Sequence, residues 1–391
     1  MYAIQHLFLL NNINKMKFTH VKRQNYFKYL VFILIITVVF DYLGAKIYRY
    51  VIEDTKRKLF LENDTLGFLH KLNAEFTVSW QESPNGKITF KTNNLGFREN
   101  SPTFLEKECD YRILVFGDSH TDGVVNNENS FVNVAESTLN KTEPDFVEII
   151  NAGIGHQNLF QQYLQFKQSL YLKPNVAIFA FYTGNDFIEI LDKSVFHLEF
   201  EEGTLNPHPA QQTVINFLSE NSLIFRIVRK FNTSAYFKAE RIKRYALWQS
   251  LAQEYYFNKN PEDFEKAVYL HKYVLTQIKK AAKKNGVQIY FIILPSKYQV
   301  ERNSDLDNFK KIEEILDLSP NAEVDEKIRI NISEILITNE IPFLDPYEEF
   351  IKQASTSRPL FWNADHHLSE EGHKKLGLLL ADHLKKTIDI N

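Results

Sequence analysis

Residues 112–120 read RILVFGDSH, an apolar run that ends abruptly in Gly-Asp-Ser-His. An apolar run without polar alternation predicts a strand buried on both faces, as in a parallel sheet covered by helices. Polar residues that follow such a strand lie at the sheet edge where open α/β folds gather their functional groups. This stretch therefore predicts the fold class and places a candidate site at Ser119.

The same pattern recurs along the chain. Strands separated by helical stretches predict a doubly wound α/β domain. We therefore expect a flavodoxin-like three-layer α/β/α fold with a five-stranded parallel sheet. The four further strands are expected at 147–150 (VEII), 176–182 (VAIFAFY), 287–294 (VQIYFIIL) and 341–344 (IPFL).

Polar motifs follow three of these strands. A serine hydroxyl is a poor nucleophile until a base takes its proton, and the base needs a third group to hold its tautomer. Three residues can take these roles: Ser119 as the nucleophile, His367 as the base and Asp365 as the group that holds its tautomer. The motifs are Asn151-Ala152-Gly153-Ile154-Gly155, Gly184-Asn185-Asp186 and, after the fifth strand, residues 363–369 (NADHHLS).

These blocks, in this order, resemble the SGNH, or GDSL-like, hydrolase superfamily over about residues 109–385. The resemblance implies an ester-bond hydrolase that uses Ser119 as its nucleophile and needs no cofactor. It also implies an oxyanion hole, made by the backbone amides of Ser119 and Gly155 and the side-chain amide of Asn185. Residues 92–98 (TNNLGFR) are similar to the lead-in of membrane-anchored bacterial members.

The glycine of the second block has two candidates. The family's functional glycine closes its block, which favours Gly155, but the block here is one residue shorter than usual. Gly153 therefore stays as the alternative.

The base also has two candidates. The family's common spacing is Asp-x-x-His, whereas one residue separates Asp365 from His367. In an extended segment these two side chains point to the same side, so both can reach the site. His366 is the rival, with Asn363 three residues before it, but an amide would orient an imidazole without stabilising its positive charge. We favour His367.

Composition narrows the class of protein. The 391 residues suffice for one large domain or two ordinary ones, and 44% hydrophobic residues with 14% aromatics exclude a disordered chain. A net charge of −3 disfavours nucleic acid as a partner. The single cysteine, Cys109, excludes an intrachain disulfide. His120, His156 and His373 share no ligand spacing, so we expect no metal.

The N-terminal region contains the apolar run 29–45 (YLVFILIITVVFDYLGA), in which Asp41 is the only charge. Its length predicts one transmembrane helix, with a cleaved signal peptide or a buried core helix as alternatives. Lysines and arginines flank it equally, so they do not decide its orientation. A start at Met16 would leave a short basic segment typical of export signals. We therefore expect a single-pass protein of the bacterial cytoplasmic membrane with its catalytic domain outside the cytoplasm.

The expected organisation follows from these segments. Residues 1–28 form a basic tail, 29–45 the membrane helix, 46–108 a membrane-proximal segment with a β-hairpin, and 109–391 the hydrolase-like domain with a mostly helical insertion at about 188–285. A basic patch in the insertion is either a solvated helix face or a site for anionic lipid headgroups or acidic glycans. It comprises Arg226, Arg229, Lys230, Lys238, Arg241, Lys243 and Arg244.

The leading functional hypothesis is a membrane-anchored serine esterase. It would act through a Ser-His-Asp triad and an acyl-enzyme on an O-acylated envelope glycan or lipid. One alternative is an O-acyltransferase that passes the same acyl group to a sugar. Another, of a different class, is a non-catalytic envelope binding or scaffold protein. Neither protein partners nor oligomeric state can be predicted.

Overall fold

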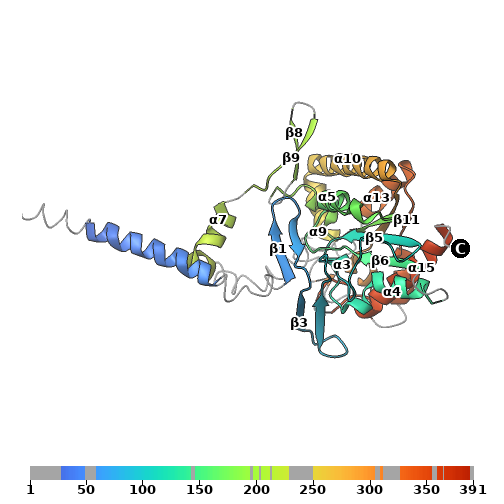
Figure 1. Cartoon of the computed structure of the whole chain (residues 1–391). Coiled ribbons are helices and arrows are strands. Elements are labelled where there is room, and N and C mark those ends of the chain that lie inside the picture. The colour runs from blue at the N-terminus through green and yellow to red at the C-terminus, as the bar shows by residue number, and fades with distance from the viewer. Residues whose placement is uncertain are drawn as a thin grey trace, which may run out of the picture. The chain divides into compact units, whose positions relative to one another are not determined.

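The computed structural model of the chain (Figure 1) describes residues 28–48, 59–141, 146–193, 197–201, 204–211, 214–228, 250–303, 309–310, 326–354, 359–363 and 365–387. It divides into two compact units. One consists of Met1–Asp54 and Gln212–Ala235, and the other of Thr55–Gln211 and Tyr236–Asn391. Of the predicted basic patch, Arg226 is described, while Arg229, Lys230, Lys238, Arg241, Lys243 and Arg244 lie outside the described residues.

The larger unit is built on a five-stranded parallel sheet. Its strand order is β11-β10-β7-β5-β6, which is the flavodoxin-like order, so the predicted fold class is confirmed. The chain passes from β5 to β6 on one side and then crosses to β7 on the other, so the topological switch point lies between β5 and β7. The strands are β5 (Tyr111–Gly117), β6 (Val147–Asn151), β7 (Val176–Tyr182), β10 (Gln288–Leu294) and β11 (Phe343–Leu344).

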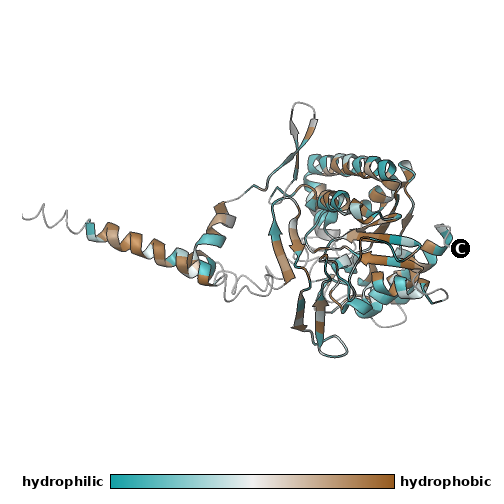
Figure 2. Cartoon of the chain, in the orientation of Figure 1, coloured by the Kyte–Doolittle hydropathy of each residue, from teal (hydrophilic) through white to brown (hydrophobic). Residues whose placement is uncertain are grey.

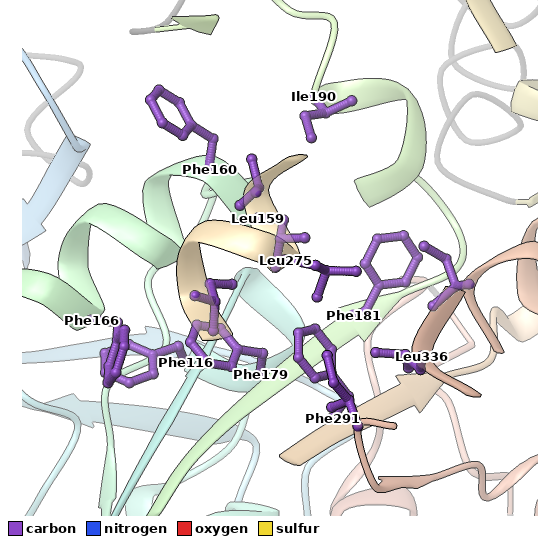
Figure 3. Close-up of a cluster of buried hydrophobic side chains, with 14 of the residues drawn as sticks. Phe116, Leu159, Phe160, Phe166, Phe179, Phe181, Ile190, Leu275, Phe291 and Leu336 are labelled. Atoms are coloured by element: carbon purple, nitrogen blue, oxygen red, sulfur yellow. The ribbon is translucent and has the colours of Figure 1, made fainter. Parts of the chain in front are cut away.

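Helices cover both faces of the sheet because the side chains of each strand alternate between two cores. Leu114 and Phe116 of β5 belong to one cluster, and Ile113 and Val115 to the other. In the first, the Phe179 ring stacks between Phe116 and Phe291, with centroids 5.4 and 5.2 Å away (Figure 3). The helices of this face are α5 (Leu159–Ser169), α10 (Pro261–Asn285) and α13 (Lys327–Thr338). Those of the other are α4 (Phe131–Leu139), α14 (Tyr347–Ala354) and α15 (Glu370–Thr387).

The remaining elements are short. The antiparallel pairs are β1 (Phe60–Asn63) with β2 (Gly67–His70), β3 (Glu75–Ser79) with β4 (Lys87–Lys91), and β8 (His197–Glu201) with β9 (Thr204–His208). The helices are α3 (Ser119–Asp122), α6 (Asp186–Glu189), α7 (Val214–Asn221), α9 (Ser250–Lys259) and α11 (Lys297–Glu301), with 3₁₀ turns at Asn127–Asn129 and Leu170–Leu172.

The smaller unit contains one long apolar helix, Lys28–Tyr48. Its mean hydropathy reaches 2.2 (Figure 2). Almost all of its apolar side chains are exposed. Within the described part of the chain it is the one helix long and apolar enough to cross a membrane, a property that a signal sequence shares.

Candidate functional site

Ser119 occupies the sharp turn from β5 into α3. It is the first residue of α3, and the carboxylate of Asp118 caps this helix by accepting the His120 N–H at 2.9 Å. The first amides of a helix have no intrahelical acceptor and present partial positive charge. The turn therefore sets the Ser119 hydroxyl at the N-terminus of α3, at the switch point of the sheet.

The structure brings Ser119, His367 and Asp365 into one hydrogen-bonded chain. His367 Nε2 lies 2.8 Å from Ser119 Oγ, and His367 Nδ1 hydrogen-bonds to Asp365 Oδ1. The same carboxylate oxygen accepts the backbone N–H of His367 at 2.9 Å. The short Asp-x-His spacing is thus compatible with contact, because one carboxylate holds both the ring and the backbone of the residue two positions later.

The pKa values of His367 and Asp365 suit these two residues to proton transfer. Burial by itself would lower the pKa of His367, but attraction to Asp365 and the hydrogen bond between them outweigh it, so the net pKa is raised. Burial would raise the pKa of Asp365, but the contacts with His367 outweigh it and the pKa is lowered. A carboxylate that stays ionised beside a basic imidazole can stabilise the imidazolium that forms when a serine is deprotonated.

His366, the rival base, has a different environment. Its Nδ1 lies 3.4 Å from Asp365 Oδ1. Burial, followed by repulsion from His367, lowers its pKa to about 3. A base with so low a pKa has little driving force to take a proton from serine near neutral pH. The geometry and the electrostatics both favour His367.

Three buried histidine side chains lie close together here. Only His120 among them belongs to the three histidines considered from the sequence as metal ligands. Ring nitrogens of His120, His366 and His367 lie within 4.8 Å of one another. Imidazoles are zinc ligands, but both ring nitrogens of His367 already serve Asp365 and Ser119. His120 stacks on Tyr182 with centroids 3.6 Å apart, and burial lowers its pKa well below the ordinary value. A metal here would have to break a hydrogen bond of the serine–histidine–aspartate chain.

The loop that carries His367 is held by a buried lysine that the sequence reasoning missed. Lys297 is 2% exposed, and its ammonium donates to Trp362 O at 2.9 Å and to Asn363 O at 3.4 Å. The Trp362 N–H in turn donates to His367 O at 3.0 Å. No motif marks Lys297, since its partners are backbone carbonyls 65 and 66 positions away.

The two candidate glycines have different neighbours. A Cβ on Gly153 would lie 2.5 Å from the Asp122 amide nitrogen, so close packing against α3 excludes a side chain there. A Cβ on Gly155 would meet Ser119 Cβ at 3.7 Å, an ordinary contact. Gly155 therefore lies beside Ser119 itself, whereas Gly153 supports the helix that carries it.

Asn185 ends the turn after β7, and α6 follows it. Its Nδ2 donates to the carboxylate of Glu189, which leaves the second amide hydrogen for another acceptor. Burial is the main cause that raises the pKa of Glu189 to about 7. The neighbouring Asp186 accepts the Tyr182 N–H at 2.9 Å and so braces the turn. Sequence reasoning identified Asn185 but missed Glu189, one helical turn later.

The segment 92–98 packs under α3. The Arg98 side chain is fully buried and donates to Asp122 Oδ1 at 2.8 Å and to Val125 O at 3.0 Å. His70 Nε2 lies 3.2 Å from the other oxygen of Asp122. Burial would raise the pKa of Asp122, but His70 and Arg98 outweigh it and the pKa is lowered. The segment thus supplies the counter-charge for the helix that begins at Ser119.

No family model matches the chain, and no curated protein matches it. Solved structures do show similarity. A variant of an acetyl xylan esterase from Geobacillus stearothermophilus is 13% identical with a TM-score of 0.37, covering 71% of this chain and 94% of its own.

Two more solved structures are similar to the same extent. A lipase/acylhydrolase from Enterococcus faecalis is 14% identical with a TM-score of 0.36, covering 71% of this chain and 96% of its own. A GDSL-like lipase from Bacteroides thetaiotaomicron is 14% identical with a TM-score of 0.34, covering 71% of this chain and 90% of its own. At these scores no property of the three proteins is carried over to this chain.

Proposed function

We propose that this protein is a serine esterase of the SGNH type. The observation that carries the proposal is the hydrogen-bonded chain from Ser119 Oγ through His367 to the Asp365 carboxylate. A binding or scaffold protein does not need a nucleophile, a base and an orienting carboxylate that are joined by hydrogen bonds. The domain that holds them is assigned to residues 109–391, with residues 1–28, 29–45 and 46–108 as tail, membrane helix and membrane-proximal segment.

The proposed reaction proceeds through an acyl-enzyme. His367 Nε2 takes the proton of Ser119 as Oγ attacks the ester carbonyl, and the imidazolium returns this proton to the departing alcohol. A water molecule then gives a proton to His367 and attacks the acyl carbon. The imidazolium returns this proton to Ser119 Oγ as the carboxylic acid leaves, which restores both residues. Asp365 stabilises the imidazolium in both halves and keeps its own charge.

Backbone and amide donors are proposed to hold the oxyanion. The Ser119 amide opens α3, Gly155 lies against Ser119, and Asn185 retains one amide hydrogen beyond its bond to Glu189. Donors fixed before the reaction stabilise developing charge without reorganising. These three are the groups that the family resemblance implies.

The apolar helix Lys28–Tyr48 supports the proposal of a membrane anchor. An exposed apolar helix of 21 residues is long enough to span the hydrocarbon core of a bilayer. We place the protein in the bacterial cytoplasmic membrane with its catalytic domain outside the cytoplasm. An O-acylated envelope glycan or lipid is then the substrate class within its reach.

A turnover assay tests the proposed function. The full chain in detergent micelles is given p-nitrophenyl acetate, and free acetate and nitrophenol are both measured, with and without an added glycan. Equal release of both products is expected. Nitrophenol without acetate, together with an acetylated glycan, would assign transfer to a sugar, and a folded protein without turnover would contradict an esterase.

The pH dependence should follow His367. The base must be neutral to act, so kcat/KM falls as pH drops through the pKa of His367. Because Asp365 raises that pKa above its ordinary value of 6.5, the midpoint of the acidic limb is expected above pH 6.5. In Asp365→Asn the midpoint should move to lower pH. A midpoint unmoved by this substitution would show that another group titrates.

Glu189 is expected to act as a positioning residue for Asn185. At pH 8 Glu189→Ala should lower kcat about fivefold with little change in KM, because one oriented hydrogen bond is worth about 1 kcal/mol. Glu189→Gln keeps an acceptor oxygen and should restore most of kcat. Equal losses in both variants, or a loss in KM alone, would contradict this role.

A further inference from the structure

A segment of the insertion returns to the apolar helix. The smaller unit joins Met1–Asp54 to Gln212–Ala235. The described part of the second piece contains α7 (Val214–Asn221) and a further helical stretch at 223–228. We call residues 214–228 the return segment. Its contacts with the apolar helix are polar as well as apolar.

The polar contacts involve the charged residues at the end of the apolar helix. Asp41 Oδ1 accepts the Ile224 N–H at 2.6 Å, and Lys46 Nζ donates to Asn221 Oδ1 at 3.1 Å. Asp41 is the only charge in the apolar run 29–45. A charged group in or near a bilayer is costly unless it has a partner. The return segment supplies that partner at a helix start, where the backbone dipole favours a carboxylate.

Close packing supports the same pairing. A Cβ on Gly44 would lie 2.8 Å from Leu223 Cδ2, so the missing side chain lets the two backbones approach. The adjacent Ala45 is 0% exposed, although most of the apolar helix is exposed. Small residues at a helix contact are typical of packing within membranes.

The return segment exposes large apolar side chains. Five of them are exposed by between 43% and 73%. They are Val214, Phe217, Ile224, Ile227 and Val228. The helix Lys28–Tyr48, to which the segment is hydrogen-bonded, also exposes most of its apolar side chains. Lys46 and Arg226 add positive charge beside it.

We propose that the return segment is a second membrane contact, lying in the headgroup and upper acyl region of a phospholipid bilayer beside the anchor. This rests on the proposed membrane anchoring. Apolar side chains on one side and cations at the edge are the features of an interfacial helix on an anionic bilayer. The chain that joins β7 to β10 is thereby tied to the membrane at a point far in sequence from the N-terminal helix.

A disulfide tests the pairing. In a Cys109→Ser background, Gly44→Cys with Leu223→Cys should cross-link on mild oxidation, because the Cβ positions are 3.6 Å apart, within the range of disulfides. The pair also removes the Leu223 Cδ2 atom that would meet a side chain at 44. In the control pair, Ile33→Cys with Leu223→Cys, position 33 lies about 16 Å from position 44 along the helix axis. This pair should stay reduced. Equal cross-linking in both pairs, or none in the first, would overturn the docking.

Fluorescence tests the membrane contact. The full chain, labelled with an environment-sensitive dye at Phe217→Cys or Ile227→Cys in the Cys109→Ser background, is placed in phosphatidylethanolamine and phosphatidylglycerol vesicles. Lipids with a quencher high on the acyl chain should remove most of the emission at both sites. The control Ser219→Cys, about 200° around α7 from Phe217, should lose much less.

The outcomes separate this inference from the proposed function. Unquenched dye at 217 and 227, in protein that floats with the vesicles and still hydrolyses p-nitrophenyl acetate, would overturn the return segment as a membrane contact and leave the anchored esterase intact. Protein that hydrolyses the ester but does not float would overturn both the anchor and the inference. Loss of turnover with flotation and quenching unchanged would contradict the triad and leave the membrane contact intact.

Discussion

His367→Ala is expected to lower kcat/KM for p-nitrophenyl acetate by at least about 10³-fold. The reason is geometric: His367 Nε2 lies 2.8 Å from Ser119 Oγ, and its other ring nitrogen is held by Asp365. Without the imidazole, the hydroxyl keeps its proton and the departing alcohol has no donor. Steady-state kinetics on folded protein, verified by circular dichroism, measure the loss.

The neighbouring histidine is the matched control. His366→Ala removes an imidazole from the same buried cluster, but one with a low pKa, so a loss of less than about tenfold is expected. Ser119→Ala should lose as much as His367→Ala, and the double variant no more than either, because the two groups act as one unit. A larger loss in His366→Ala than in His367→Ala would reverse the assignment of the base.

Arg98→Met is expected to lower the free energy of unfolding by about 3 to 5 kcal/mol. The substitution leaves the buried Asp122 carboxylate without the guanidinium 2.8 Å away, and leaves the Val125 carbonyl without its donor. Unlike a surface pair, this one is shielded from water, since the Arg98 side chain is 0% exposed. Denaturant unfolding of the full chain in micelles measures the change.

An exposed ion pair provides the comparison. Lys91→Met removes the partner of Glu75, at side-chain exposures of 46% and 63%, and should cost less than about 1 kcal/mol. Adding Asp122→Leu to Arg98→Met should recover part of the loss, because it removes the unpaired buried charge. If Arg98→Met were as mild as Lys91→Met, the account of this network would be wrong.

The strands of the sheet could be predicted from the sequence because each is marked by its own run of apolar residues. Strands buried on both faces read as apolar runs, and the observed bounds of β5, β6 and β7 lie within one residue of the predicted ones. The strand β11 is shorter than the predicted 341–344, since only Phe343 and Leu344 pair with β10. Polar residues at strand ends carry equally local information, so Ser119 and Asn185 could be proposed as candidate site residues.

The supporting residues were not predictable because their partners are distant. Lys297 binds carbonyls 65 and 66 positions away, and Arg98 meets Asp122 across 24 positions. In the sequence they are a lysine after a strand and an arginine in a turn, with nothing to show burial. Likewise, the sequence shows Asp41 only as the one charge in an apolar run, because its partner at Ile224 is 183 positions away.

The most direct test of the account is covalent labelling of the serine. The full chain is treated with a fluorophosphonate, and the modified peptide is identified by mass spectrometry, with Ser119→Ala as control. One adduct on Ser119 is expected, formed more slowly below the raised pKa of His367 and absent from Ser119→Ala. A folded protein that forms no adduct, or that carries it on another residue, would contradict Ser119 as an activated nucleophile.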